Sequence, residues 1–142
     1  MVVLNPNNWH WVDKNTLQWT NGYFEDRFAN WHNSNDEYVV TVERLKSCNG
    51  DSNVSQRKGK VICYFDLQLE FDAALTKDGE EVSKGTITVP EFMHDESDFE
   101  VNLSSFGSHS NIVKDVVLRK FVSDLLAYQQ DLIDSHSQTL QQ

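Results

Sequence analysis

The histidines are the residues to examine first, because an imidazole can act as an acid or a base and can bind a metal ion. The chain has five of them, and none lies three or four residues from another: His10, His32, His94, His109 and His136. His94 opens the acidic stretch HDESD, whose carboxylates could hold a hard cation through oxygen ligands. That stretch lacks the spacing and the glycine of an EF-hand loop, so we interpret it as a solvated acidic loop.

Nucleophilic and cofactor chemistry have no recognisable motif in the sequence. Cys48 and Cys63 show neither a CxxC spacing nor a metal-ligand pattern. The nucleophile elbow, the phosphate-binding loop, the dinucleotide fingerprint and the helical zinc motif are all missing. We therefore predict a protein without catalysis, metal or cofactor. One alternative stays open, a metal-dependent or small-molecule enzyme built around His10, His94 and Asp95.

The best candidate for binding lies in the stretch QRKGKVICYFDL. Three of the twelve basic residues fall within four positions of a chain whose formal net charge is −10: Arg57, Lys58 and Lys60. Ile62 and Tyr64 follow on the polar side of the next strand. Apolar side chains beside concentrated charge are typical of an interface core with a polar rim. Because Asp51 and Asp66 lie close by in sequence, this pattern favours a protein partner over nucleic acid.

A second candidate is the N-terminal stretch NPNNWHWVDK, residues 5–14. Trp9 and Trp11 flank His10 in an otherwise polar segment. The two tryptophans can fold back over the helices as a cover. They can equally anchor the segment on a partner, where tryptophan is a favoured residue. A passive holdase that binds unfolded chains through these tryptophans is a further alternative.

The elements that must position these residues begin with a helix predicted over residues 15–31. Leu17, Phe24, Phe28 and Trp31 recur at spacings that place them on one helix face. Residues 38–45 are β-branched and alternating, which predicts a strand. The following Asn49–Ser52 cluster indicates a turn.

The clearest element is a strand over residues 61–73, in which all seven side chains of one parity are apolar. The opposite parity carries Ile62 and Tyr64 followed by polar residues, which predicts one buried and one wet face. Asp78-Gly79 indicates a turn. A strand is predicted over residues 85–91 and ends there because Pro90 has no N–H for pairing with a neighbouring strand. Residues 98–103 are predicted to form a last strand.

From residue 110 the apolar spacing changes to three or four, which predicts an amphipathic helix over 110–135. The sequence therefore predicts an α+β fold: a four-stranded antiparallel meander within residues 37–104, flanked by an N-terminal helix and a long C-terminal helix.

Composition limits the setting in which such a fold would act. At 142 residues the chain predicts one domain, residues 1–142. A pI near 4.7 counts against nucleic acid and anionic membranes as partners. Neither a signal peptide nor a membrane-spanning apolar run is visible. We therefore expect a monomeric cytoplasmic protein with reduced cysteines.

The motifs NPNNWHWVDK, GDSNVSQRKGKVICYFDL and TVPE resemble those of the activators of the 90-kDa heat-shock chaperone's ATPase. The length and the stretch PEFMHDESD look most like the short, single-domain yeast member of that family. The resemblance implies an elongated α+β domain that binds the chaperone's middle domain and stimulates ATP hydrolysis. It implies no catalysis of its own.

The resemblance also implies roles for individual residues. Ile62 and Tyr64 would meet an apolar patch of the middle domain. The charged residues would face the chaperone's catalytic loop, whose arginine reaches the γ-phosphate of ATP: Asp51, Arg57, Lys58, Lys60 and Asp66. His94 and Asp95 occupy positions where the family can present an apolar residue followed by aspartate. The N-terminal motif would take part in stimulating the chaperone's ATPase and in its handling of nucleotide: Asn7, Asn8, Trp9, His10, Trp11 and Lys14.

Overall fold

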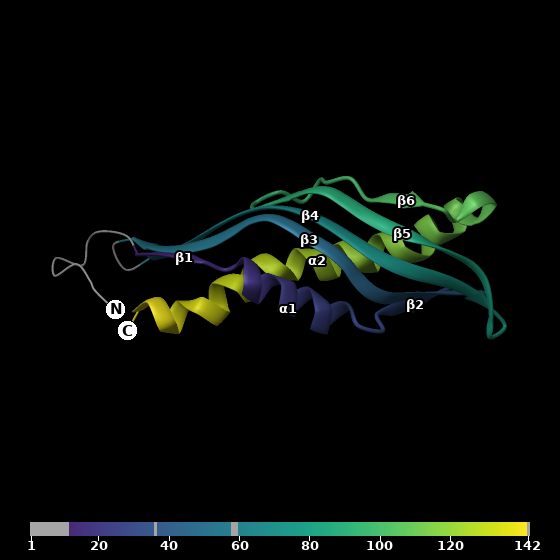
Figure 1. The fold of residues 1–142 in the computed structure, drawn as a ribbon, viewed down its shortest axis with the longest axis horizontal. Coiled ribbons are helices and arrows are strands. Elements are labelled where there is room, and N and C mark those ends of the chain that lie inside the picture. Colours follow the sequence, from purple (N-terminus) through teal and green to yellow (C-terminus); the bar gives the residue numbers. More distant parts are fainter. Residues whose placement is uncertain (1–11, 36, 58–59, 142) are drawn as a thin grey trace.

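One antiparallel sheet packs against two helices in the computed structural model, which describes residues 12–35, 37–57 and 60–141 (Figure 1). The elements are β1 (Val12–Asn15), α1 (Leu17–Phe28), β2 (His32–Ser34), β3 (Tyr38–Arg57), β4 (Lys60–Lys77), β5 (Glu80–Met93), β6 (Asn102–Ser104), a 3₁₀ turn η1 (Gly107–His109) and α2 (Ser110–Gln141). The described sheet has six strands in the order β1-β3-β4-β5-β6, and β2 also pairs with β3. The predicted α+β class is confirmed, with more strands than the predicted four.

Both helices lie side by side on one face of the sheet, which we call the inner face (Figure 1). The tyrosine hydroxyl of Tyr23 in α1 donates to Asp131 in α2 at 2.6 Å and fastens the two helices together. The opposite, outer face of the sheet is uncovered by any described helix. This one-sided cover explains the alternation of apolar and polar residues along the strands.

The long hairpin of β3 and β4 organises the molecule. Its register runs from Tyr38↔Lys77 to Arg57↔Lys60. The predicted turn at 49–52 is wrong, because β3 continues through these residues. Gly50 has a φ of 117°, and a Cβ there would overlap the main-chain carbonyl oxygen of Asp66. The glycine thus permits a close approach of β4 rather than a change of chain direction.

The alternation predicted for β4 is confirmed. Phe65, Leu67 and Leu69 are buried on the inner face, whereas Ile62 and Tyr64 are exposed. The strand is longer than the predicted 61–73 and ends just before the predicted turn at Asp78-Gly79.

The two last strands differ from their predicted bounds. Pro90 does not end β5, which continues to Met93. Pairing instead skips from Leu69↔Val89 to Leu67↔Phe92, so Pro90 lies at an irregularity where its missing N–H costs no ladder hydrogen bond. β6 covers only the end of the predicted strand 98–103 and the residue after it.

The N-terminal helix is shorter than the predicted 15–31, because the chain first forms β1 against the far end of β3. Asn15 Oδ1 accepts the main-chain N–H of Leu17 at 2.9 Å, which satisfies one free donor at the helix start. Trp31 lies beyond the helix yet remains 7% exposed, and its indole N–H donates to Asp124 at 2.7 Å.

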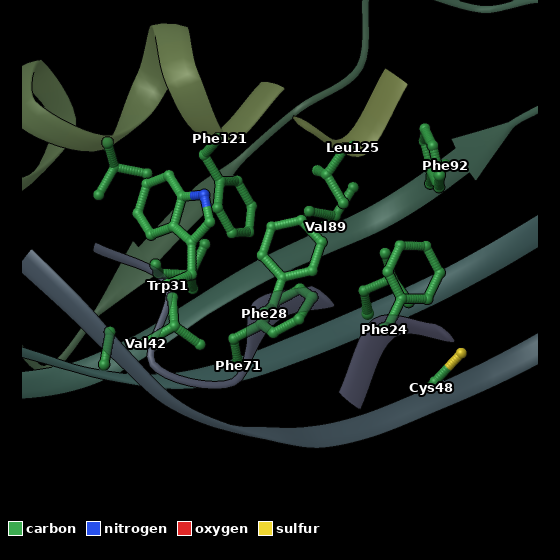
Figure 2. Packing of buried hydrophobic residues seen from close by; sticks show 14 of the residues in the cluster. Phe24, Phe28, Trp31, Val42, Cys48, Phe71, Val89, Phe92, Phe121 and Leu125 are labelled. Atoms are coloured by element: carbon green, nitrogen blue, oxygen red, sulfur yellow. The ribbon is translucent and has the colours of Figure 1, made fainter. Parts of the chain in front are cut away.

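The core between sheet and helices is rich in aromatic rings (Figure 2). Phe28 from α1, Phe71 from β4 and Phe121 from α2 meet with ring centroids 5.1–5.3 Å apart. Such pairs contribute about 0.5–1.5 kcal/mol each beyond the burial of their area. The helix α2 supplies buried apolar side chains from Val113 to Leu132, and its backbone extends beyond the predicted end at 135.

Four buried hydroxyl groups tie α1, α2 and β3 together. Tyr128 in α2 lies 2.7 Å from both Thr20 and Ser52, and Ser52 lies 2.8 Å from Thr16. Burial raises the pKa of Tyr128 to about 12, so the phenol stays protonated and available to donate. Among the described residues every buried side-chain polar atom has a partner. This cluster fixes β3 at the residue next to Asp51.

Among the described helices, none combines the length and hydropathy required to cross a membrane.

Candidate functional site

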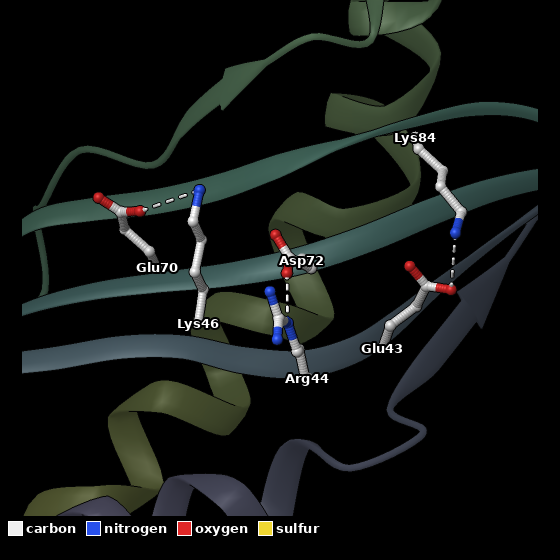
Figure 3. A network of polar contacts seen from close by, with 6 residues as sticks. All are labelled: Glu43, Arg44, Lys46, Glu70, Asp72 and Lys84. Atoms are coloured by element: carbon white, nitrogen blue, oxygen red, sulfur yellow. Dashed lines mark hydrogen bonds and ion pairs between the residues drawn. The ribbon is translucent and has the colours of Figure 1, made fainter.

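The outer face of the sheet is divided into two regions, and the first is covered by paired charges (Figure 3). Three ion pairs cross between strands there: Arg44 with Asp72 at 2.6 Å, Lys46 with Glu70 at 3.8 Å and Lys84 with Glu43 at 3.4 Å. The first two pairs join the neighbouring strands β3 and β4, and the third reaches across β4 from β5 to β3. Exposed pairs of this kind add little stability.

The second region lies toward the hairpin end and is apolar. Ile62 is 42% exposed and Tyr64 is 43% exposed, and both point outward from β4. Exposed Lys60 lies on the same side of the strand. We call Lys60, Ile62 and Tyr64 the hairpin patch. Complete burial of a side chain such as Ile62 against a partner is worth roughly 1.5–3 kcal/mol.

Two carboxylates border the hairpin patch on neighbouring strands. Asp51 on β3 lies directly opposite Asp66 on β4. Among the described residues neither carboxylate forms an ion pair. Like charges directly opposite one another destabilise a sheet, so a basic group placed between them would relieve the repulsion.

A third carboxylate on this border was missed by sequence reasoning. Asp13 on β1 lies opposite Ser55, which in turn lies opposite Ile62. The Ser55 hydroxyl donates to Asp13. Because β1 itself was not predicted, nothing in the sequence placed Asp13 beside the hairpin.

His94 lies next to the hairpin patch, whereas Asp95 is directed elsewhere. The His94 ring lies 5.0 Å from the Tyr64 ring. Asp95 accepts a hydrogen bond from the Gln129 side chain at 2.8 Å, and its main-chain N–H donates back to Gln129 at 2.8 Å. Asp95 therefore anchors the loop after β5 to α2.

The remaining predicted residues divide into two groups. Lys14 lies opposite buried Val54, which places it at the inner side of the sheet edge and away from the patch. The backbone of Arg57 pairs with Lys60 at the hairpin end. The other residues lie outside the described part of the chain: Asn7, Asn8, Trp9, His10, Trp11 and Lys58.

The described residues hold no group of three or more histidine, cysteine or acidic side chains arranged to bind a metal ion. Burial raises the pKa of the Cys48 thiol to about 11. Burial and the nearby Asp95 carboxylate raise the pKa of the Cys63 thiol. Both thiols are therefore protonated at neutral pH and poorly suited to act as nucleophiles.

An open cleft continues this surface beyond β5. It has a volume of about 400 Å³ and is lined by Pro90, Glu91, Met93, Glu96, Asp98, Phe99 and Glu100. Met93 lies opposite Asp66, so the cleft adjoins the border of the hairpin patch. The patch is thus surrounded by carboxylates on two sides.

The family described as "Activator of Hsp90 ATPase, N-terminal" matches residues 13–136. The chain belongs to this family. The match includes α1, the whole hairpin and α2 as far as residue 136, so the hairpin patch lies within the shared domain.

Relatives extend the likeness over nearly the full chain. Hsp90 co-chaperone HCH1 of Saccharomyces cerevisiae is 45% identical, covering 99% of this chain and 99% of that protein. Hsp90 co-chaperone AHA1 of the same yeast is 33% identical, covering 99% of this chain and 44% of that protein. Activator of 90 kDa heat shock protein ATPase homolog 2 of Bos taurus is 27% identical, covering 80% of this chain and 45% of that protein.

Solved structures share the fold. The crystal structure of Aha-1 from Plasmodium falciparum matches with a TM-score of 0.73 at 20% identity, covering 89% of this chain and 90% of that one. The solution structure of the human Aha1 N-terminal domain matches with a TM-score of 0.61 at 17% identity, covering 82% of this chain and 92% of that one.

Proposed function

We propose that this chain is a cytoplasmic co-chaperone that binds the middle domain of Hsp90 as a monomer and stimulates its ATPase. The proposal assigns no catalysis to the chain itself. Membership of the activator family supports it, together with the names of relatives that are Hsp90 co-chaperones. The Hsp90 active site would supply the chemistry, and this chain would change how often that site is assembled.

One observation carries the proposal. Ile62 and Tyr64 are exposed on the outer face, next to the region in which charges are paired across strands. The paired strands β1, β3 and β4 hold the main chain of both residues in place, so little conformational entropy is lost when they are covered. This combination favours a protein-docking surface over a solvated strand.

The charged residues around the patch provide a route from binding to stimulation. A ligand shifts a conformational equilibrium only if it binds one state better than the other. The catalytic loop of Hsp90 in its active conformation would make more favourable contacts with the basic residues Arg57, Lys58 and Lys60. A basic side chain of that loop would pair with the carboxylates of Asp51 and Asp66. Such coupling typically amounts to ~1–3 kcal/mol.

The substitution Ile62→Asp tests the docking surface. It should weaken binding to the isolated middle domain by roughly 10–100-fold, measured by calorimetry, since it removes apolar burial and adds a desolvated charge. The melting temperature should barely change, because Ile62 is 42% exposed in the free protein.

Val82→Asp is the matched control, because Val82 is 40% exposed but lies on β5 at the far end of the sheet. It should leave the affinity unchanged. Equal losses of affinity in both variants, or no loss in either, would contradict the assignment of the docking surface to the hairpin patch.

A further inference from the structure

The edge of the sheet beside the hairpin patch has no partner strand in the described chain. β5 pairs with β4 only as far as Asp66↔Met93, and the main-chain N–H of His94 then donates to the carbonyl of Phe65 at 3.2 Å. The chain turns away after this contact. Among the described strands, none pairs with residues 60–64 on the side away from β3.

The direction of the main-chain groups on this edge follows from Phe65. Its C=O accepts from the main chain of His94, and its N–H lies 3.4 Å from His94 Nδ1 on the same side. In an antiparallel strand the N–H and C=O of one residue point to one side, and successive residues alternate. Val61 and Cys63 therefore direct their N–H and C=O groups to the free edge, whereas Ile62 directs its groups to β3.

We propose that this edge pairs with the same edge of a second copy of the chain, antiparallel and centred on Ile62. This register places Val61 opposite Cys63 of the second copy. The main-chain N–H and C=O groups on the two free edges then exchange hydrogen bonds. The overlap is limited to residues 60–64, because β4 begins at one end and His94 occupies the position beyond the other end.

The side chains on the outer face match in the same register. Ile62 lies against Ile62 of the second copy, which covers the facing sides of two side chains that are each 42% exposed in the single chain. Lys60 lies opposite the Tyr64 ring of the second copy, where a cation–π contact can form. Asp66 of the second copy is the diagonal neighbour of Lys60, which gives the pairing complementary charge. This self-complementarity identifies a second copy as the occupant.

The size and charge of the contact set its strength. A short strand pair buries far less than the ~1,200 Å² of a standard interface. Two chains of net charge −10 also repel each other. The dimer should therefore be weak, and added salt should strengthen it by screening the repulsion. It would place a second molecule directly beside Ile62 and Tyr64, so self-association and Hsp90 binding would compete; this consequence rests on the proposed function.

Sedimentation velocity of the full chain tests the dimer, from low micromolar to near-millimolar concentration and at low and high salt. The weight-average mass should rise with concentration toward twice that of the monomer, and more steeply at high salt. Val61→Pro should prevent the rise, because it removes an N–H on the free edge and none that faces β3. Val61→Ala keeps that N–H and should self-associate like the unchanged chain.

A chain that stays monomeric at the highest concentration and salt would overturn the proposal, as would a Val61→Pro variant that dimerises normally. Hydrogen exchange on the unchanged chain gives a second measurement. Exchange of the Val61 and Cys63 amides should slow as concentration rises. Slow exchange at every concentration would show that the edge is already covered within the single chain and would refute the dimer. Middle-domain binding by Val61→Pro is measured separately, so the two proposals can fail independently.

Discussion

Ile62 and Tyr64 are exposed because of strand parity. Their neighbours Cys63 and Phe65 point to the inner face, where Phe65 is buried in the aromatic core. Polar residues at positions 62 and 64 would leave that core unchanged, so packing within the chain does not require isoleucine or tyrosine there. The proposed contact with another molecule would give these two side chains a physical role.

The basic residues at the hairpin end should control stimulation more than affinity. The double substitution Arg57→Ala with Lys58→Ala should remove most of the increase in Hsp90 ATPase rate at saturating concentration, because it removes the charges proposed to favour the active loop. Middle-domain affinity should change by less than about tenfold, since Ile62 and Tyr64 remain. A steady-state ATPase titration measures both quantities.

The matched control substitutes an arginine and a lysine of β3 that lie away from the hairpin end, Arg44→Ala with Lys46→Ala. Both of these residues are paired, with Asp72 and Glu70 respectively, on the other region of the outer face. The control should stimulate normally. Full stimulation by the hairpin variant, or an equal loss in the control, would contradict the role of the hairpin charges.

Single-residue features differ in how far sequence reveals them. Alternation along one strand was sufficient to predict the outward direction of Ile62 and Tyr64. The opposition of Asp51 and Asp66, and the position of Asp13, depend on strand register between segments far apart in the chain. The register between these strands is fixed by the packing of side chains on the inner face. It therefore could not be predicted from the residue pattern within any one strand.

At the scale of elements, the length of β3 is the feature on which the site depends. A turn at 49–52 would have ended the ribbon well before the hairpin patch. Gly50 instead stays within the strand with a φ of 117° and lets the main chain of β4 approach closely. The Asn-Gly-Asp-Ser cluster was wrongly interpreted as a turn. Glycine can adopt a positive φ, and this property suits both a turn and a close approach of a neighbouring strand.

Gly50→Ala should destabilise the protein by more than about 2 kcal/mol, because the new Cβ would overlap the Asp66 carbonyl and the residue would hold a strained φ. Urea denaturation measures the free energy of unfolding. Gly22→Ala provides the contrast: this glycine lies inside α1 with nothing within 4 Å of an added Cβ, so the change should stabilise by about 0.5–1 kcal/mol. Similar effects of the two substitutions would show that Gly50 has no special role.

The bounds of helices and strands were predicted best where apolar residues recur regularly over many positions and lie on one side of the element. The α2 helix and the β4 strand each bury a continuous apolar side, and both were placed correctly apart from their ends. β1 was missed because its residues, Val12–Asn15, carry little apolar pattern and are held by pairing with β3. Helix α1 was overextended because Trp31 continues the helical spacing although it packs from outside the helix.

At the scale of the whole molecule, an acidic chain presents a small apolar and basic surface at one end of its long hairpin. The ion pairs along the rest of the outer face match charge with charge between strands. The bordering carboxylates and the acidic cleft beyond β5 surround the patch. Net charge should therefore disfavour acidic partners in general, while the patch selects a partner with an apolar centre and nearby basic groups.

The most direct test is a titration of the isotopically labelled chain with the isolated middle domain of Hsp90, followed through its backbone amide signals. The largest changes should fall on residues 60–64 and on Asp51 and Asp66, with little change around the ion-paired strands or at Val82. A titration without changes, or one whose changes fall on α1 and α2, would contradict docking through the hairpin patch.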